Sequence, residues 1–474
     1  MGICKRILII GTSLAALTAL IACGSGAVKK TTKTPVVVTV WNYYNGAQQE
    51  RFNSLVSEFN DSVGREQNII VEAISKGTID ELVQGMQDSM DKKVGSDPLP
   101  NLYSAYANDA YAMNEAGMLA DMKPYMTEEE MAAYVSGYIE EGQFESEDTL
   151  KIFPIAKSTE VLTLNRTDWE PFAAETGVTT EDLSTWEGVA RVAEAYYNWA
   201  GGKAFFGRDA FANYVLVGSA QLGHEIYRVE DGKPVLDFDE ETMRRLWDYY
   251  YVPYIHGYYV SGGKFRSDDL KTGHLLAYVG STSGAPYTPT TVTYEDGTVH
   301  EISCVILPVP NFEGTDAVAI QQGAGMVLLK SEEAVEQAAV TFLKWFTQAK
   351  TNIEFSIDSG YLPVQKQANS KEFLEQVIAD EKLEVSAVLK DTLDIGMAEV
   401  THSRMYTMKP FSKSSAARTI LDTTMADQAK ADREQIEKLM EGGMSLEEAV
   451  GQYDTEEHFK EWYDATRQKL ESVE

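Results

Sequence analysis

Six short clusters of polar and aromatic side chains could bind a small polar molecule. Four of them follow predicted strands and two come later in the chain: Asn42–Tyr44, Tyr106–Asp109, Ser158–Thr159, Gly280–Gly284, Gly360–Pro363 and Arg404–Tyr406. Hydroxyls, amides and a carboxylate can pair with the donors and acceptors around a polyol, and aromatic faces can stack on its C–H side. The clusters therefore favour recognition without turnover, although each one taken alone also fits an ordinary loop.

Locally recognisable catalytic motifs do not occur in the sequence. It contains neither a Gly-x-Ser-x-Gly nucleophile elbow nor the Gly-rich Lys-Ser/Thr loop that holds phosphates. The stretch Gly323–Leu328 lacks the last glycine of a dinucleotide-binding motif and is more typical of a tight strand. A glycosidase needs two carboxylates facing one bond, and no local pair stands out among the 73 acidic residues. We therefore predict a protein that is not an enzyme and has no cofactor.

Composition argues against metal and nucleic-acid sites. The three cysteines are Cys4, Cys23 and Cys304, and the six histidines are scattered without paired spacing, so we predict no metal site. The formal net charge of −32 repels phosphate backbones, which excludes nucleic acid as a partner.

The first part of the chain alternates strand and helix patterns. Val36–Trp41 and Leu102–Ala105 have the composition of buried strands, and apolar residues at helical spacing predict helices over Ala47–Asn60 and Ile79–Met90. Such alternation predicts a parallel sheet with helices on both faces. Because open sheets of this kind bind ligands at the carboxyl ends of their strands, the polar clusters are expected to share one cleft.

One stretch, Leu150–Arg166, predicts how two lobes are joined. Its ends are apolar, but Ala156–Glu160 in the middle is small and polar, which a buried strand does not need. A strand that leaves one lobe and enters another would have core ends and a middle that faces solvent or ligand. A chain of 474 residues is long enough for two or more lobes. The alternative is an edge hairpin with a proline-marked turn.

The N-terminus predicts export. Lys5 and Arg6 precede an apolar run, Ile7–Ala22, that is short for a membrane span. Leu20–Cys23 resembles the lipobox of bacterial lipoprotein signal peptides, which implies that residues 1–22 are removed and that Cys23 is lipidated, for example with palmitate. Residues 23–35 then form a flexible tether, and the protein is anchored at the extracytoplasmic face of the cell membrane. An uncleaved anchor is the alternative.

Taken together, several segments resemble the extracellular solute-binding proteins of bacterial ABC importers, in their large carbohydrate-type class. The segments, in this order, are Val38–Tyr44, Phe153–Asn165, Thr185–Glu187, Leu276–Gly284, Ile306–Pro308, Gly323–Val327, Phe342–Phe346 and Ser359–Pro363. The resemblance covers essentially the whole chain after the tether. It implies a two-lobed α/β fold in which each lobe is a mostly parallel sheet flanked by helices, with the ligand cleft between the lobes.

The resemblance also implies how the chain is divided. We expect residues 36–153 and 323–400 to form the first lobe, and residues 154–322 and 401–474 to form the second. The chain would cross between them near Phe153–Lys157, near Ala319–Gly323 and around His402.

Glycerol-phosphate binders of this class match at several positions. Ser158, Ser281 or Ser283, Gly323 and Tyr361 fall where those proteins contact ligand, and Arg404 resembles their late arginine that meets phosphate, a geometry that suits a guanidinium fork. The sequence departs from them at Thr78, where they carry an aromatic residue, and at Ala107, where they carry glutamate. A sugar or oligosaccharide is therefore our first prediction, with glycerol-3-phosphate or another sugar phosphate as the alternative.

The sequence thus predicts a monomeric solute receptor that hands a carbohydrate to ABC permease subunits. The expected ligand contacts are Trp41, Tyr43, Tyr44, Tyr106, Asn108, Asp109, Ser158, Thr159, Ser281, Ser283, Gly323, Tyr361 and Arg404. An exported glycoside hydrolase and a surface adhesin remain the competing classes.

Overall fold

The computed structural model describes residues 34–230 and 232–473. The predicted signal peptide and the lipidation site at Cys23 lie outside this range. No helix within the described residues is long and apolar enough to span a bilayer.

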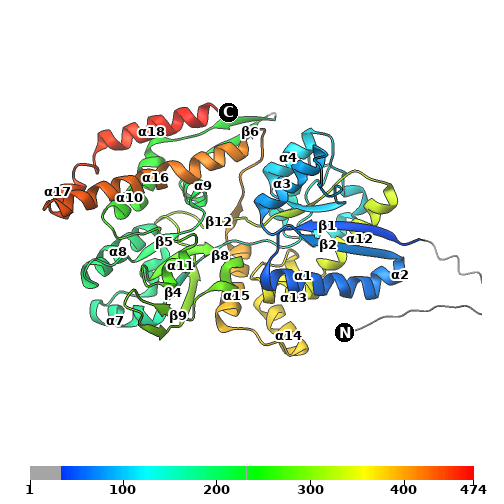
Figure 1. Ribbon diagram of the computed structural model, residues 1–474, viewed down its shortest axis with the longest axis horizontal. Helices are drawn as coiled ribbons and strands as arrows, with labels where there is room; N and C mark the ends of the chain where they lie inside the picture. The colour runs from blue at the N-terminus through cyan, green and yellow to red at the C-terminus, as the bar shows by residue number, and fades with distance from the viewer. Residues whose placement is uncertain (1–33, 231, 474) are drawn as a thin grey trace, which may run out of the picture. The chain divides into compact units, whose positions relative to one another are not determined.

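The first sheet has the strand order β13–β3–β1–β2 and follows the predicted strand–helix alternation (Figure 1). Its strands are β1 (Val36–Asn42), β2 (Ile69–Ser75), β3 (Leu102–Ala105) and β13 (Gly325–Leu328). The strand β1 is parallel to both β2 and β3, and β13 is antiparallel to β3 at the edge. The β-branched run that begins β1 favours the extended chain.

Helices cover both faces of this sheet, as predicted. On one face, α1 (Gly46–Phe59), α12 (Glu333–Phe346) and α13 (Ala349–Ser359) bury phenylalanine rings against the strands. On the other face lie α3 (Ile79–Met90), which starts at a Thr78–Glu81 capping box, and α4 (Ala107–Glu115). Shorter or more peripheral helices are α2 (Arg65–Gln67), α5 (Glu128–Ala132), α6 (Ser136–Gly142) and α14 (Lys371–Glu381). We call this sheet and its helices the first lobe.

The second sheet has the order β11–β4–β8–β5. Its strands are β4 (Glu160–Asn165), β5 (Phe206–Arg208), β8 (Ala277–Ser281) and β11 (Cys304–Pro308). Only β5 and β8 pair in parallel, because β4 is antiparallel to both of its neighbours. The prediction of a mostly parallel sheet is therefore wrong for this lobe. The physical reason is that the chain enters this sheet from a crossing segment, so β4 starts at the edge where β8 ends.

This second lobe has its own core, which is separate from the core of the first. It is rich in aromatic rings, among them Trp186, Tyr214 and the stacked pair Trp247 and Tyr251. Its helices are α7 (Arg166–Thr176), α8 (Trp186–Trp199), α9 (Phe211–Gln221), α10 (Glu240–Ile255), α11 (Arg266–Lys271), α16 (Ser414–Glu441), α17 (Leu446–Val450) and α18 (Glu456–Glu471). Two small hairpins complete it, β6 (Tyr227–Glu230) with β7 (Lys233–Leu236) and β9 (Thr291–Thr293) with β10 (Val299–Glu301).

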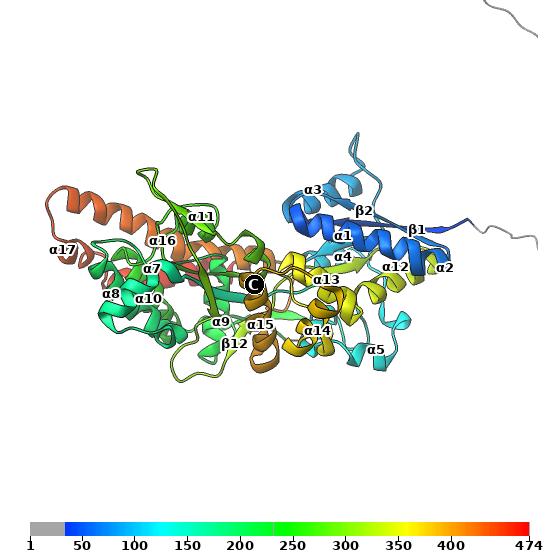
Figure 2. The same ribbon diagram turned by 90° about the horizontal axis from the view of Figure 1, so that it is seen from below.

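Crossing segments connect the two sheets. Phe153 pairs with Met326 and Ser158 pairs with Gln322, so two crossing segments run side by side. A third, β14 (Arg404–Tyr406), pairs in parallel with β12 (Val318–Ile320). The helix α15 (Ala387–His402) lies between the lobes in both views (Figures 1 and 2) and contributes apolar residues to the core of the first lobe. The residue boundaries proposed above for the lobes stay a prediction.

The polar middle of the first crossing is buried, so the expectation that it faces solvent is wrong, while its contact with a ligand stays a prediction. Lys157 is 1% exposed, and its ammonium lies 2.6 Å from a Glu141 carboxylate oxygen and 2.6 Å from the Gly323 carbonyl oxygen. Burial is tolerated here because these partners satisfy the charge. Since the β4 strand that follows lies inside its sheet, the alternative of an edge hairpin is excluded.

Candidate functional site

Three tyrosine hydroxyls meet where strands of the first lobe end. Tyr43 follows β1, Tyr106 follows β3, and Tyr361 follows α13 after Gly360 turns the chain with φ +70°. The hydroxyl oxygens of Tyr43 and Tyr361 are 3.0 Å apart, and the Tyr106 side chain hydrogen-bonds to Tyr43. Burial raises the pKa of Tyr43 and of Tyr361, so both phenols stay neutral and can donate as well as accept.

Two serines of the second lobe complete this cluster. Ser281 ends β8 and Ser283 lies in the following 3-10 helix, Thr282–Tyr287, with their hydroxyl oxygens 2.9 Å apart. The Ser283 side chain hydrogen-bonds to Tyr361 across the lobes. A Cβ atom at Gly360 would lie 2.4 Å from the Thr282 carbonyl oxygen, so glycine lets the two loops approach. We call Tyr43, Tyr106, Ser281, Ser283 and Tyr361 the hydroxyl cluster.

Charged side chains at the same edge of the second sheet were not predicted from the sequence. Glu160 begins β4 opposite Ser281, and its carboxylate receives hydrogen bonds from Arg208 at 2.7 and 2.8 Å and from Asn213 at 2.8 Å. Arg418 of α16 donates to the Asn213 side-chain oxygen at 2.6 Å. Only the polarity of Ala156–Glu160 signalled Glu160 in the sequence.

Arg418, and Asp209 at the end of β5, are further charged groups of the second lobe that the sequence did not predict. Desolvation raises the pKa of Tyr106, and the nearby Arg418 guanidinium acts in the opposite direction, which places a positive charge beside this hydroxyl. Desolvation also raises the pKa of Asp209 to about 6, although hydrogen bonding and charge from Arg266 oppose the shift. The arrangement can therefore offer a ligand hydroxyls, a guanidinium and a carboxylate.

Several predicted contacts lie in the core rather than at the cluster. Trp41 is 2% exposed and packs between the first sheet and α3, with the Lys76 ammonium 3.6 Å from its ring centroid. Tyr44 is 1% exposed and packs against Phe52 and Phe355. Neither ring offers a free face, so the expected stacking by Trp41 and Tyr44 is not supported by this geometry.

Three other predicted contacts, Ser158, Thr159 and Gly323, belong to the crossing segments. Ser158 and Thr159 are buried; Ser158 pairs through its backbone with Gln322, and the Thr159 hydroxyl donates to Glu399 at 3.3 Å. Gly323 has φ +90° beside the same crossing.

The remaining three predicted residues have separate partners. Asn108 donates from its side chain to Asp109 and to the Ser415 hydroxyl of the second lobe, and desolvation raises the pKa of Asp109. Arg404 contacts Glu225 at 3.3 Å and the Ala220 carbonyl oxygen at 3.3 Å. The structure thus brings Asn108 to an interlobe contact and gives Arg404 partners outside the hydroxyl cluster.

Two cavities in the described part of the chain lie away from the hydroxyl cluster. Cavities of about 520 and 280 Å³ lie against α16, the first bordered by the α17 region and the second by α18. The hydroxyl cluster does not line either of them. No group of three or more potential metal ligands occurs within residues 34–230 and 232–473.

Comparisons with known proteins give a matching family model and solved structures of similar fold. A family model described as bacterial extracellular solute-binding protein matches residues 54–385. The cyclic α-maltosyl-1,6-maltose binding protein of Arthrobacter globiformis has 17% identity and a TM-score of 0.63, over 93% of this chain and 99% of that one. UgpB of Mycobacterium tuberculosis in complex with glycerophosphocholine has 16% identity and a TM-score of 0.67, over 93% and 98%.

A third solved structure is the GacH receptor of Streptomyces glaucescens, which was determined unliganded and with acarbose. It has 14% identity and a TM-score of 0.63, over 93% of this chain and 100% of that one. Among curated proteins no match was found. The structural likenesses confirm the two-lobed α/β fold.

Proposed function

Because the chain belongs to the family of bacterial extracellular solute-binding proteins, we propose that it captures a carbohydrate between its two lobes and delivers it to the membrane subunits of an ABC importer. The observation that carries this proposal is the hydroxyl cluster, in which Tyr361 of one lobe bonds to both Tyr43 and Ser283. Neutral hydroxyls from both lobes suit the many donors and acceptors of a sugar or an oligosaccharide. The binding of sugars by proteins of similar fold supports the same substrate class.

Binding would act by favouring the closed arrangement of the lobes. A ligand that replaces the hydrogen bonds between Tyr43, Tyr361 and Ser283 contacts both sheet edges at once, and such differential contacts shift the equilibrium toward closure. The closed form would then be the one that docks on the permease.

The carboxylates at the sheet edge support a receptor rather than a hydrolase. Glu160 is 2% exposed and is bound by Arg208 and Asn213, so it has little freedom to act as an acid or a base. Asp209 already accepts a hydrogen bond from the backbone N–H of Arg266 at 3.0 Å. Because Glu160 is committed to structural partners, Asp209 alone does not supply the two facing carboxylates that glycoside hydrolysis needs.

A sugar phosphate or glycerol phosphate is the second candidate, and Arg418 is the observation that favours it. Arg418 is half-buried, its charge acts on Tyr106, and its guanidinium donates to a neutral amide and forms no ion pair within the described residues. An unneutralised guanidinium suits an anionic ligand. The binding of glycerophosphocholine by a protein of the same fold is consistent with this alternative.

The membrane attachment also stays a proposal. The lipobox-like sequence that ends at Cys23 supports lipidation there, followed by a tether up to residue 35. Metabolic labelling with a palmitate analogue, compared between the wild type and Cys23→Ala, tests this attachment.

The monomeric state also stays a proposal, and size-exclusion chromatography with light scattering tests it.

A thermal-shift screen over sugars, polyols and sugar phosphates tests the function directly. A ligand that binds only the native state raises the unfolding temperature by mass action. We expect a carbohydrate to give the largest shift and to be recovered intact after incubation. Glycerol phosphates as the best ligands would favour the second candidate, and turnover of a glycoside would favour a hydrolase. If a macromolecule binds and no small solute does, the protein is an adhesin.

A further inference from the structure

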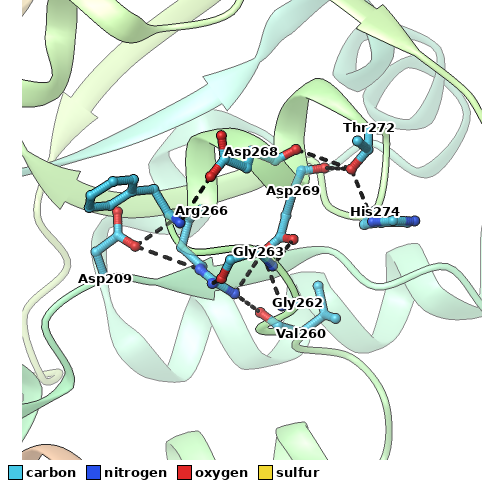
Figure 3. A network of polar contacts seen from close by, with 10 residues as sticks. Asp209, Val260, Gly262, Gly263, Arg266, Asp268, Asp269, Thr272 and His274 are labelled. Carbon is cyan, nitrogen blue, oxygen red and sulfur yellow. Dashed lines mark hydrogen bonds and ion pairs between the residues drawn. The ribbon is translucent and has the colours of Figure 1, made fainter.

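A backbone loop of the second lobe is held rigidly at the edge that carries the candidate site. The loop runs from Val260 to Phe265, between α10 and α11, and the network that holds it is shown in Figure 3. Asp269 accepts hydrogen bonds from the backbone N–H groups of Gly263 at 2.7 Å and Gly262 at 3.2 Å. Arg266 donates to the Gly263 carbonyl oxygen and pairs with Asp269 at 2.6 Å.

These bracing charges are almost fully buried. The side chains of Arg266 and Asp269 are 4% and 3% exposed. Burying an ion pair is costly unless its remaining donors and acceptors are satisfied, and here the loop backbone satisfies them. Removing either charge would therefore release the loop, so the ion pair fixes the loop's conformation.

The loop is joined to the ligand edge through Asp209. The Arg266 backbone N–H donates to an Asp209 carboxylate oxygen at 3.0 Å, and the Asp209 N–H donates to the Val279 carbonyl oxygen of β8 at 2.9 Å. Two residues farther along β8 is Ser281 of the hydroxyl cluster. The Asp209 side chain keeps 26% of its surface exposed, so its carboxylate is open to a ligand.

The backbone next to Asp209 is strained. Ala210 has φ +46° and ψ +63°, a left-handed conformation that costs a non-glycine residue free energy. Such strain persists only where the surrounding structure holds it, and it directs the chain from β5 into α9. The position of Asp209 at this edge is thus fixed from both sides, by Ala210 and by Arg266.

The rigid loop presents an apolar ring to solvent. Phe265 is 53% exposed, among the most exposed large apolar residues described, and the Lys264 ammonium lies 5.3 Å from its ring centroid. A ring on a fixed backbone loses little conformational freedom when it binds, which favours stacking on the C–H face of a sugar. Asp209, which accepts the backbone N–H of Arg266, the residue after Phe265, can accept hydrogen bonds from sugar hydroxyls.

We propose that Phe265 and Asp209 form an outer subsite that binds a further sugar unit of an oligosaccharide whose first unit lies at the hydroxyl cluster. This inference rests on the proposed carbohydrate function. Phe265 would then determine the preference for longer ligands, since a short ligand contacts only the hydroxyl cluster and a longer one also covers the Phe265 ring. An apolar ring without a polar tip discriminates by stacking alone.

Isothermal titration of the full chain with maltose, maltotriose and maltotetraose tests this subsite. In Phe265→Ala the loss of affinity should grow with the length of the probe and reach about three- to tenfold for maltotetraose, the range expected for one stacking contact. Phe265→Leu keeps an apolar side chain but no ring face, and it should also weaken maltotetraose. Val299→Ala, which changes a residue on β10 that is 59% exposed, serves as the control and should bind as the wild type does.

The outcomes separate this inference from the proposed function. If the wild type binds the probes and Phe265→Ala binds each of them as tightly as the wild type does, the subsite is refuted while the carbohydrate function stands. The same holds if only uptake through the permease is lost, because the ring would then face the importer. If the wild type binds none of the three probes, the subsite is refuted; if the broad carbohydrate screen is also negative, the proposed function fails too.

Discussion

Glu399 provides the most stringent test of the structure where the lobes are joined. It lies in α15 and is 6% exposed; one carboxylate oxygen accepts the Val309 N–H at 2.8 Å and the other accepts the Thr159 hydroxyl at 3.3 Å. Desolvation raises the pKa of Glu399 to about 8, the hydrogen bonds from Val309 and Thr159 oppose the shift, and the charge of Glu160 adds to it. The buried carboxyl is therefore mostly protonated at neutral pH.

The sign of the pH dependence follows from proton linkage. The ordinary pKa of 4.5 applies in the unfolded chain, so the native state binds more protons between pH 4.5 and about 8. The contribution of Glu399 to stability is therefore most favourable below pH 4.5 and falls as the pH rises through this window. Between pH 5 and pH 9 the predicted loss is roughly 3–4 kcal/mol, from about 1.4 kcal/mol per pKa unit.

The variant Glu399→Gln keeps the shape of the protonated acid but cannot ionise. Relative to the wild type, its free energy of unfolding should change by less than about 1 kcal/mol at pH 5 and should be higher by roughly 3 kcal/mol at pH 9. Urea denaturation followed by circular dichroism at pH 5, 7 and 9 measures this difference. Glu434→Gln, at an exposed position of α16, is the control for the change in net charge. Parallel stability curves for the wild type and Glu399→Gln would show that the carboxyl is ionised throughout and would refute the burial argument.

Three further substitutions test the site and the crossing segments. Tyr361→Phe removes a hydroxyl that bonds its tyrosine partner at 3.0 Å, and affinity for the best carbohydrate should fall by about 1 kcal/mol, or roughly fivefold, in isothermal titration; an unchanged Kd would exclude a direct contact. Gly323→Ala would place a Cβ atom 2.9 Å from the Ala156 carbonyl oxygen at φ +90°, so urea denaturation should show a loss of about 1–3 kcal/mol, and wild-type stability would contradict the tight crossing. Ser415→Ala breaks the interlobe hydrogen bond from Asn108, worth about 1 kcal/mol, so X-ray scattering of the unliganded protein should show a larger radius of gyration; an identical scattering curve would mean that this contact does not hold the lobes together.

Local sequence patterns were sufficient to predict most helices and strands of the first lobe. The helix predicted over Ile79–Met90 has those bounds in the structure, because a capping box at its start and apolar residues at helical spacing are local signals. The strands predicted at the start of the chain also form, since β-branched runs favour extended backbone. The pairing in the second sheet was predicted incorrectly because strand direction depends on where β4 enters, which no local pattern records.

The candidate site was only partly predictable, and the reason is physical. The order of short motifs identified the family and, with it, Tyr43 and Ser283, because strand ends carry polar residues where ligands bind. The bond between Tyr43 and Tyr361 joins residues 318 positions apart, and Arg418 lies within a long helix with no local mark of a binding role.

The amino-acid sequence by itself determined the helices, the strands of the first lobe and the class of protein, because periodicity, caps and motif order are properties of neighbouring residues. Only the tertiary structure decided that Trp41 is core and that Lys157 and Glu399 are buried. Burial and desolvation depend on the segments that pack around a side chain, and in this fold those segments come from distant parts of the chain.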